Sequence, residues 1–133
     1  PNSLSIIYGW NPLQYGHLEG DQLVITNTVQ LPKMFSLARG STHGCAYKNE
    51  YWFMVHFVHQ TSGEMRTYYH SLVKFTDKMV PLAYTLPFKF SREKIEYCLG
   101  LIVEEDRVIV SHSSMDRTSD ISVYSNTFEW INI

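Results

Sequence analysis

The chain has 133 residues, of which 44% are hydrophobic and 14% aromatic, enough for one domain with a packed core and too apolar for a disordered chain. A formal net charge of −2 supplies no basic field for nucleic acid. No apolar run approaches the roughly 18 residues that a membrane span needs, so we expect neither nucleic acid nor a membrane as a partner.

Strand-like runs follow one another from the first residues to the last. Runs rich in β-branched and aromatic residues predict strands at 4–8, 22–29, 51–58, 66–75, 80–84, 98–103, 107–111 and 121–124. Turn residues lie between them in "LEGDQ", "YKNEY", "TSGEM" and "EEDR". Residues 92–99 are a candidate short helix, which their aromatic and β-branched residues disfavour. The pattern predicts an all-β fold.

The sequence also contains an internal repeat. The segments "GCAYKNEYWFMVH" (44–56) and "GLIVEEDRVIVSH" (100–112) superimpose without a gap, with His56 on His112, and "SLSIIYGW" is a weaker third copy. Repeats of about 50 residues with about four short strands each are typical of β-propeller blades. The run 51–58 is apolar at both alternating sets of positions, so both faces of this strand should be covered.

The two cysteines, Cys45 and Cys98, lie in apolar or aromatic surroundings and belong to no paired metal motif. We therefore expect buried free thiols rather than a disulfide, which favours a reducing, cytoplasmic setting.

Several polar residues are candidates for a ligand site. Arg39 and Ser41 precede the first strand of a blade, where the Arg39 guanidinium would suit phosphate, carboxylate or sugar hydroxyls, or would bridge blades through backbone carbonyls. His56 is either a hydrogen-bonding group facing the central channel or a satisfied core histidine. His56 and His59 are three residues apart on a strand, so their side chains point to opposite faces and cannot bind one metal ion together. We therefore expect no metal site. We also expect no cofactor.

Aromatic and acidic residues complete this set. In "RTYYH" (66–70), Tyr69 and its neighbours suit either sugar rings or ordinary cross-strand packing. Glu96 and Asp116 are the acids expected near the channel end, where a carboxylate pair could hydrolyse a glycoside. "MDRTSD" reads more simply as a turn.

The run "LARGSTHG…EYWFMVHFVH…RTYYHSLVKF…PLAYTLPFKF…KIEYCLGLIVEEDRVIVSHSSMDRTSDISVY" resembles the later blades of five-bladed β-propellers related to glycoside hydrolase family 130, which contains mannoside phosphorylases and hydrolases. It is similar above all to propeller modules found beside glycosyltransferase domains in bacteria and large DNA viruses. "YGWNPLQYG" resembles the preceding blade. The resemblance implies a partial five-bladed propeller of about two and a half blades, with one domain over 1–133 and blade fragments 1–35, 36–90 and 91–133.

The resemblance also implies roles for residues. His56 matches a histidine at the phosphate-binding end of the enzymes' pocket, Tyr69 and His70 match a Tyr-Arg pair, and Asp116 matches a "GAAD"-like aspartate. The acid that the enzymes use lies on an earlier blade, so glycoside phosphorolysis or hydrolysis would require missing blades to supply it.

From these observations we expect a carbohydrate-recognising module that is not catalytic on its own. Its partners would be a carbohydrate or sugar phosphate and the remaining propeller blades, from the same or another chain. The alternative is a structural or interaction propeller without ligand chemistry, for example a virion component. The expected axial pocket is lined by Trp10, Arg39, Ser41, His56, Tyr69, His70, Glu96 and Asp116.

Overall fold

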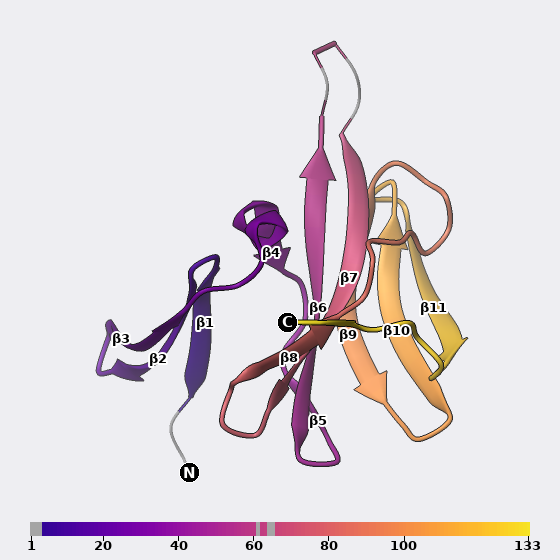
Figure 1. Cartoon of the computed structure of the whole chain (residues 1–133). Helices are drawn as coiled ribbons and strands as arrows, with labels where there is room; N and C mark the ends of the chain where they lie inside the picture. Colours follow the sequence, from indigo (N-terminus) through magenta and orange to yellow (C-terminus); the bar gives the residue numbers. More distant parts are fainter. Residues whose placement is uncertain (1–3, 61, 64–65) are drawn as a thin grey trace. The chain divides into compact units, whose positions relative to one another are not determined.

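The computed structural model describes residues 4–60, 62–63 and 66–133. This part of the chain forms twelve β-strands and one short 3-10 helix, so the all-β prediction is confirmed (Figure 1). The strands are β1 Ser5–Trp10, β2 Leu13–Glu19, β3 Gln22–Val29, β4 Ala38–Gly40, β5 Cys45–Tyr47, β6 Glu50–His59, β7 Thr67–Thr76, β8 Pro81–Tyr84, β9 Glu96–Val103, β10 Arg107–Ser114, β11 Thr118–Ser125 and β12 Ile131–Asn132, and the helix is η1 Lys33–Leu37.

The chain divides into two compact units, residues 1–39 and 40–133. In the first unit, β1, β2 and β3 form an antiparallel meander that η1 follows. Gly16 of β2 packs directly against the backbone of β3, since a Cβ at this position would lie 1.7 Å from the carbonyl oxygen of Val24. Only a glycine fits this position of the sheet.

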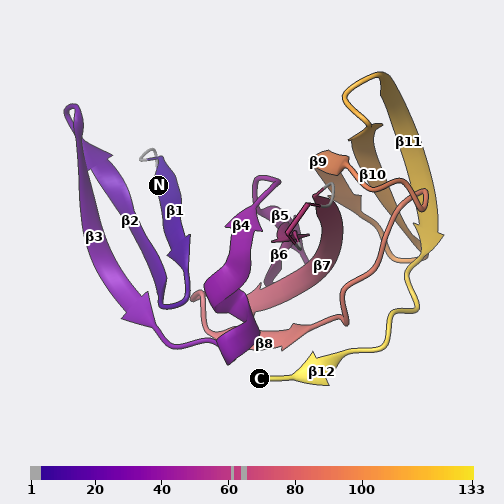
Figure 2. The ribbon, with the colours of Figure 1, turned by 90° about the horizontal axis from the view of Figure 1, so that it is seen from above.

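The second unit contains two antiparallel sheets. One has the order β12-β8-β7-β6-β4, with β5 also paired to β6, and the other has the order β11-β10-β9 (Figures 1 and 2). None of the three sheets in the described part of the chain is closed on itself. The finer assignment, a partial five-bladed propeller, stays a prediction.

The predicted strands are found with small shifts at their ends, and 22–29 coincides with β3. The candidate helix at 92–99 does not form, because β9 begins at Glu96 with alternating buried and exposed positions. The strands that sequence reasoning missed are β2, β4 and β12. β4 and β12 have three and two residues, too short to show a period, and β2 carries Gly16 and His17 inside its apolar pattern.

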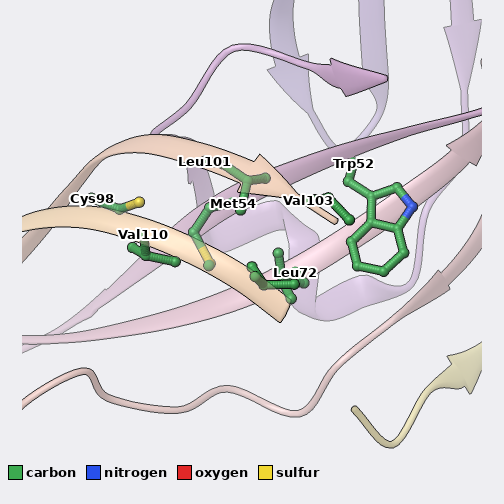
Figure 3. Close-up of a cluster of buried hydrophobic side chains, with 8 residues drawn as sticks. Trp52, Met54, Leu72, Cys98, Leu101, Val103 and Val110 are labelled. Carbon is green, nitrogen blue, oxygen red and sulfur yellow. The ribbon is translucent and has the colours of Figure 1, made fainter. Parts of the chain in front are cut away.

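The core of the second unit lies between its two sheets. Trp52, Met54 and Leu72 of β6 and β7 pack against apolar side chains of the other sheet, namely Cys98, Leu101, Val103, Val108 and Val110 (Figure 3). On the opposite face of β6, Phe53 and Val55 are buried as well. The prediction that this strand is covered on both faces is therefore confirmed.

Both cysteines are free, as predicted; Cys98 is buried, as predicted, whereas Cys45 is only half-buried. Burial raises the pKa of the Cys98 thiol to about 12, which makes this sulfur an apolar core group rather than a nucleophile.

The register of the two repeated hairpins corrects the gapless superposition. In the first hairpin Cys45 pairs with Trp52, and in the second Ile102 pairs with Ile109. Ile102 lies 57 positions after Cys45, and Ile109 lies 57 positions after Trp52. The two hairpins are therefore offset by 57 residues in the structure and not by 56. A shift of one residue moves a side chain to the other face of a strand. Trp52 therefore corresponds to Ile109 and not to Val108.

The same shift separates the two histidines of the repeat. His56 corresponds to Ser113, and His112 lies on the opposite face from the one that the superposition implied. The two histidines are not copies of one repeat position; they lie on different sheets of the second unit.

Candidate functional site

Four titratable side chains gather in the second unit where its two sheets meet. His56 of β6 is paired in register with His70 of β7, and Glu96 of β9 and His112 of β10 come from the facing sheet. We call these four residues the polar cluster. All are buried, and Phe90 stacks between His70 and His112 with ring centroids 4.0 and 4.7 Å away.

Glu96 is held by donors from the segment that precedes β9. Its carboxylate accepts hydrogen bonds from the backbone N–H of Phe90 (2.9 Å) and from the N–H and hydroxyl of Ser91 (both 2.6 Å), and Lys89 Nζ lies 3.7 Å away. Burial by itself raises the pKa of Glu96, but the Ser91 and Phe90 donors and the Lys89 charge outweigh burial and lower the pKa below its ordinary value. Glu96 is therefore an ionised, fully satisfied acceptor.

His70 is the neutral member of this pair. Burial lowers its pKa to about 3, and the nearby Glu96 charge opposes this shift only in part. The ring Nε2 lies 3.6 Å from Glu96 Oε1, just beyond hydrogen-bonding distance. Neither ring nitrogen of His70 has a hydrogen-bond partner among the described residues.

The other two histidines of the polar cluster each meet a serine. Nδ1 of His56 lies 2.7 Å from the Ser41 hydroxyl, and Nε2 of His112 lies 2.8 Å from the Ser122 hydroxyl. Tyr68 stacks on the His56 ring at 5.7 Å. The first contact ties His56 to the loop after β4, and the second joins β10 to β11, so both histidines have the hydrogen bonds expected of structural residues.

The structure brings together four of the eight predicted site residues: Ser41, His56, His70 and Glu96. Tyr69 is on the opposite face of β7 from His70, with Lys89 Nζ 5.2 Å from its ring. Asp116 is an exposed turn residue with a left-handed φ of 54°, in agreement with the turn interpretation. In the first unit, Trp10 is buried and Arg39 is exposed.

A second feature of this unit is an open groove of about 340 Å³. It is lined by Thr85, Leu86, Phe88, Tyr124, Phe128, Glu129, Trp130 and Ile131. Its aromatic rings contact one another, with centroids of Phe88 and Tyr124 6.0 Å apart and those of Phe128 and Trp130 6.2 Å apart. We call this feature the aromatic groove.

Sequence reasoning missed the aromatic groove, His112 as a member of the polar cluster, and the donors Lys89 and Ser91. The alternating aromatic residues of "TFEWINI" near the end of the chain were the available signal. They follow a strand but pair across to β8 through Ile131, a connection that no local pattern reveals.

The geometry limits the chemistry of the polar cluster. Glu96 and His70 have no exposed side-chain surface, so a substrate does not reach them in this conformation. Within the described residues, no group of three or more His, Cys, Asp or Glu side chains could hold a metal ion.

In the part of the chain that the structure describes, no helix is long and apolar enough to cross a membrane.

Comparison with family models, with curated proteins and with solved structures finds no match for this chain. The resemblance to propellers related to glycoside hydrolase family 130 therefore stays a prediction.

Proposed function

We propose that this chain is a carbohydrate-recognising β-sheet module that binds a neutral sugar in the aromatic groove and carries out no chemistry on it by itself. The observation that carries the proposal is the lining of the groove, which contains four aromatic side chains and one exposed carboxylate. Phe88, Tyr124, Phe128 and Trp130 supply the rings, and Glu129 supplies the carboxylate.

This combination suits a sugar for a physical reason. A pyranose ring presents C–H groups that pack on aromatic faces, and its hydroxyls need acceptors or donors at the edge of the contact. Glu129 supplies an exposed carboxylate at the lining of the groove, whereas the Thr85 hydroxyl is buried and accepts a hydrogen bond from the Leu72 N–H (3.0 Å). Two hydroxyls on neighbouring carbons can donate to one carboxylate, which fixes the orientation of the ring.

The charge of the lining selects between the two predicted ligand classes. The groove is lined by one acidic residue, Glu129, and by neither lysine nor arginine. A phosphate group would meet the like charge of Glu129, which is unfavourable, and Lys74, whose Nζ lies 4.4 Å from the Trp130 ring, is already paired with Glu50 at 3.8 Å. We therefore favour a neutral carbohydrate over a sugar phosphate.

The partial-propeller architecture belongs to the same proposal. Two features support it: sheets stacked face to face through apolar side chains, and a hairpin register that recurs after 57 residues. A mannose-containing glycan is the first ligand to test, because the resemblance of the sequence is to mannoside-processing propellers.

Titration of the chain with methyl mannoside and mannose oligosaccharides, followed by calorimetry, tests the proposal. Glu129→Gln keeps the shape of the side chain and removes its charge. Since a hydrogen bond to a charged group contributes about 1.5–3 kcal/mol, we expect the dissociation constant to rise at least about tenfold. Mannose 1-phosphate should bind more weakly than the neutral sugars.

Glu93→Gln is the matched control, because Glu93 is an exposed acid outside the groove lining. Its sugar affinity should equal that of the unmodified chain, and both variants should melt at the original temperature. Equal affinity of Glu129→Gln and the unmodified chain, or the absence of binding to every sugar tested, would refute the proposed function.

A further inference from the structure

One wall of the aromatic groove and the donors that hold Glu96 belong to the same stretch of chain. Residues 85–95 connect β8 to β9 and run alongside β7 before the chain enters β9 (Figure 1). Three residues of this segment line the groove, and Phe88 is the last of them. Shortly after it, Phe90 and Ser91 donate hydrogen bonds to the Glu96 carboxylate. The groove and the polar cluster are therefore linked through one segment.

Phe88 is fixed to β7 by its backbone. The His70 N–H donates to the Phe88 carbonyl and the Phe88 N–H donates to the His70 carbonyl, both at 2.8 Å. Between ring centroids, Phe88 lies 6.0 Å from Tyr124 and 6.4 Å from Phe128 in the groove, and 5.8 Å from Phe90. The position of the Phe88 ring therefore sets the spacing of the aromatic lining.

Beyond Phe88, the segment is held by Glu96. The carboxylate accepts the N–H of Phe90 at 2.9 Å and both the N–H and the hydroxyl of Ser91 at 2.6 Å, while the Phe90 ring stacks on His70 at 4.0 Å. The side chain of Glu96 has no exposed surface, so losing these donors would leave a buried charge without compensation. The carboxylate therefore holds the chain directly after Phe88 in one place.

We infer that Glu96 is a positioning residue of the aromatic groove: through the backbone of Phe90 and Ser91 it holds the Phe88 ring where a sugar would contact it. Glu96 itself makes no contact with the ligand, because its side chain is fully buried. The sugar in this inference rests on the proposed function. The effect of Glu96 on the groove, in contrast, can be measured without any sugar.

Glu96→Gln keeps the size of the side chain and removes the charge that the three donors share. NMR of the full 133-residue chain without ligand should show the amide protons of Phe90 and Ser91 moving upfield, because their hydrogen bonds are no longer charge-assisted. The Phe88 amide should exchange with solvent at least about tenfold faster, since the segment beside it opens more readily. The ring signals of Tyr124, which contacts Phe88, should shift as well.

Ser91 supplies a milder pair of variants, because it is exposed and its replacement does not disturb the core. Ser91→Ala removes one of the three donors and should move the same signals in the same direction by a smaller amount. Ser91→Thr keeps the hydroxyl and should restore them. Glu93→Gln is the matched control, an exposed acid in the same segment, and should leave them in place. Signals of the first unit should not move in any variant.

Calorimetry with mannose oligosaccharides completes the test. Ser91→Ala should bind them more weakly than the unmodified chain, Glu96→Gln more weakly still, and Ser91→Thr with restored affinity. If the unmodified chain binds no sugar, the proposed function fails and the NMR result decides whether Glu96 positions the groove. If Glu96→Gln does not fold, the Ser91 pair decides.

Three outcomes would overturn the inference. The first is a set of groove signals that Ser91→Ala leaves in place. The second is an equal shift in Ser91→Ala and Ser91→Thr, which would show that the hydroxyl donor is not what holds the segment. The third is an unchanged sugar affinity in a variant whose Phe88 amide exchanges faster.

Discussion

At the scale of single residues, the polar cluster shows how buried polar groups are accommodated in an apolar interface. Glu96 keeps its charge because three hydrogen bonds from the preceding segment converge on it. His70 stays neutral because burial disfavours its charged form and the Glu96 charge opposes this only in part; neither ring nitrogen has a hydrogen-bond partner among the described residues. Two groups a few ångströms apart therefore resist protonation for different reasons.

This arrangement predicts that the chain loses stability in mild acid. The pKa of His70 is about 3 in the folded state and 6.5 as its ordinary value, so below pH 6.5 the unfolded chain binds a proton that the folded chain does not. Stability should fall as the pH drops from 6.5 toward 3, by up to about 5 kcal/mol. Glu96, with a lowered pKa, adds to the loss below its ordinary value of 4.5.

Urea unfolding between pH 7 and pH 3.5 measures this slope. The charged and titratable groups that face His70 are His56, His112, Lys89 and Glu96. His70→Phe should flatten the dependence between pH 6.5 and 5, whereas His59→Gln, at an exposed end of β6, should leave it unchanged. A stability that does not vary over this range in the unmodified chain would contradict the burial argument.

At the scale of elements, two hairpins with equivalent registers use different turns. Lys48 and Asn49, at the β5–β6 turn, both have left-handed φ angles, 45° and 61°. This is the two-residue hairpin turn for which Asn-Gly is preferred. Glu105 and Asp106 occupy the corresponding positions at the β9–β10 turn and do not have positive φ.

The difference predicts a stabilising substitution at one turn only. Lys48→Asn together with Asn49→Gly should raise the free energy of unfolding by about 0.5–1 kcal/mol, because strain at two positive φ angles is relieved. The exposed pair of Lys48 and Glu105 contributes little that could be lost. Glu105→Asn with Asp106→Gly is the control and should give no gain in a thermal melt. A gain at both turns, or at neither, would show that φ at these positions is not what limits stability.

At the scale of the whole molecule, the division into units of 39 and 94 residues implies unequal stability. A unit below about 40 residues buries too little apolar surface to be stable by itself. The second unit holds the larger core, with eight buried residues between two sheets. Local opening should therefore cost less free energy in the first unit than in the second.

Native-state hydrogen exchange tests this expectation strand by strand. The amides of β1, β2 and β3 should exchange faster than those of β6, β7 and β10. Comparison should be limited to amides paired within a sheet, so that exposed edges do not dominate the result. Equal protection in the two units would mean that they unfold as one cooperative body.

The sequence by itself determined the strands with a clear period and the location of one core. The run 51–58 is apolar on both faces, and burying either set of side chains lowers the free energy, so a strand covered on both sides was predictable. Free thiols and the turn at Asp116 were predictable for equally local reasons. Ser41, His56, His70 and Glu96 were identified individually, but not their mutual contact.

Only the tertiary structure decided the register of the repeat and the composition of the polar cluster. Side chains alternate with a period of two along a strand, so a one-residue difference in turn position reverses which face meets the partner sheet. That difference places His112 opposite His70, across Phe90, and turns Ile121 and Val123 outward. The register is decided by which strand pairing buries more apolar surface between the two sheets. This buried area cannot be worked out from any single segment of the sequence.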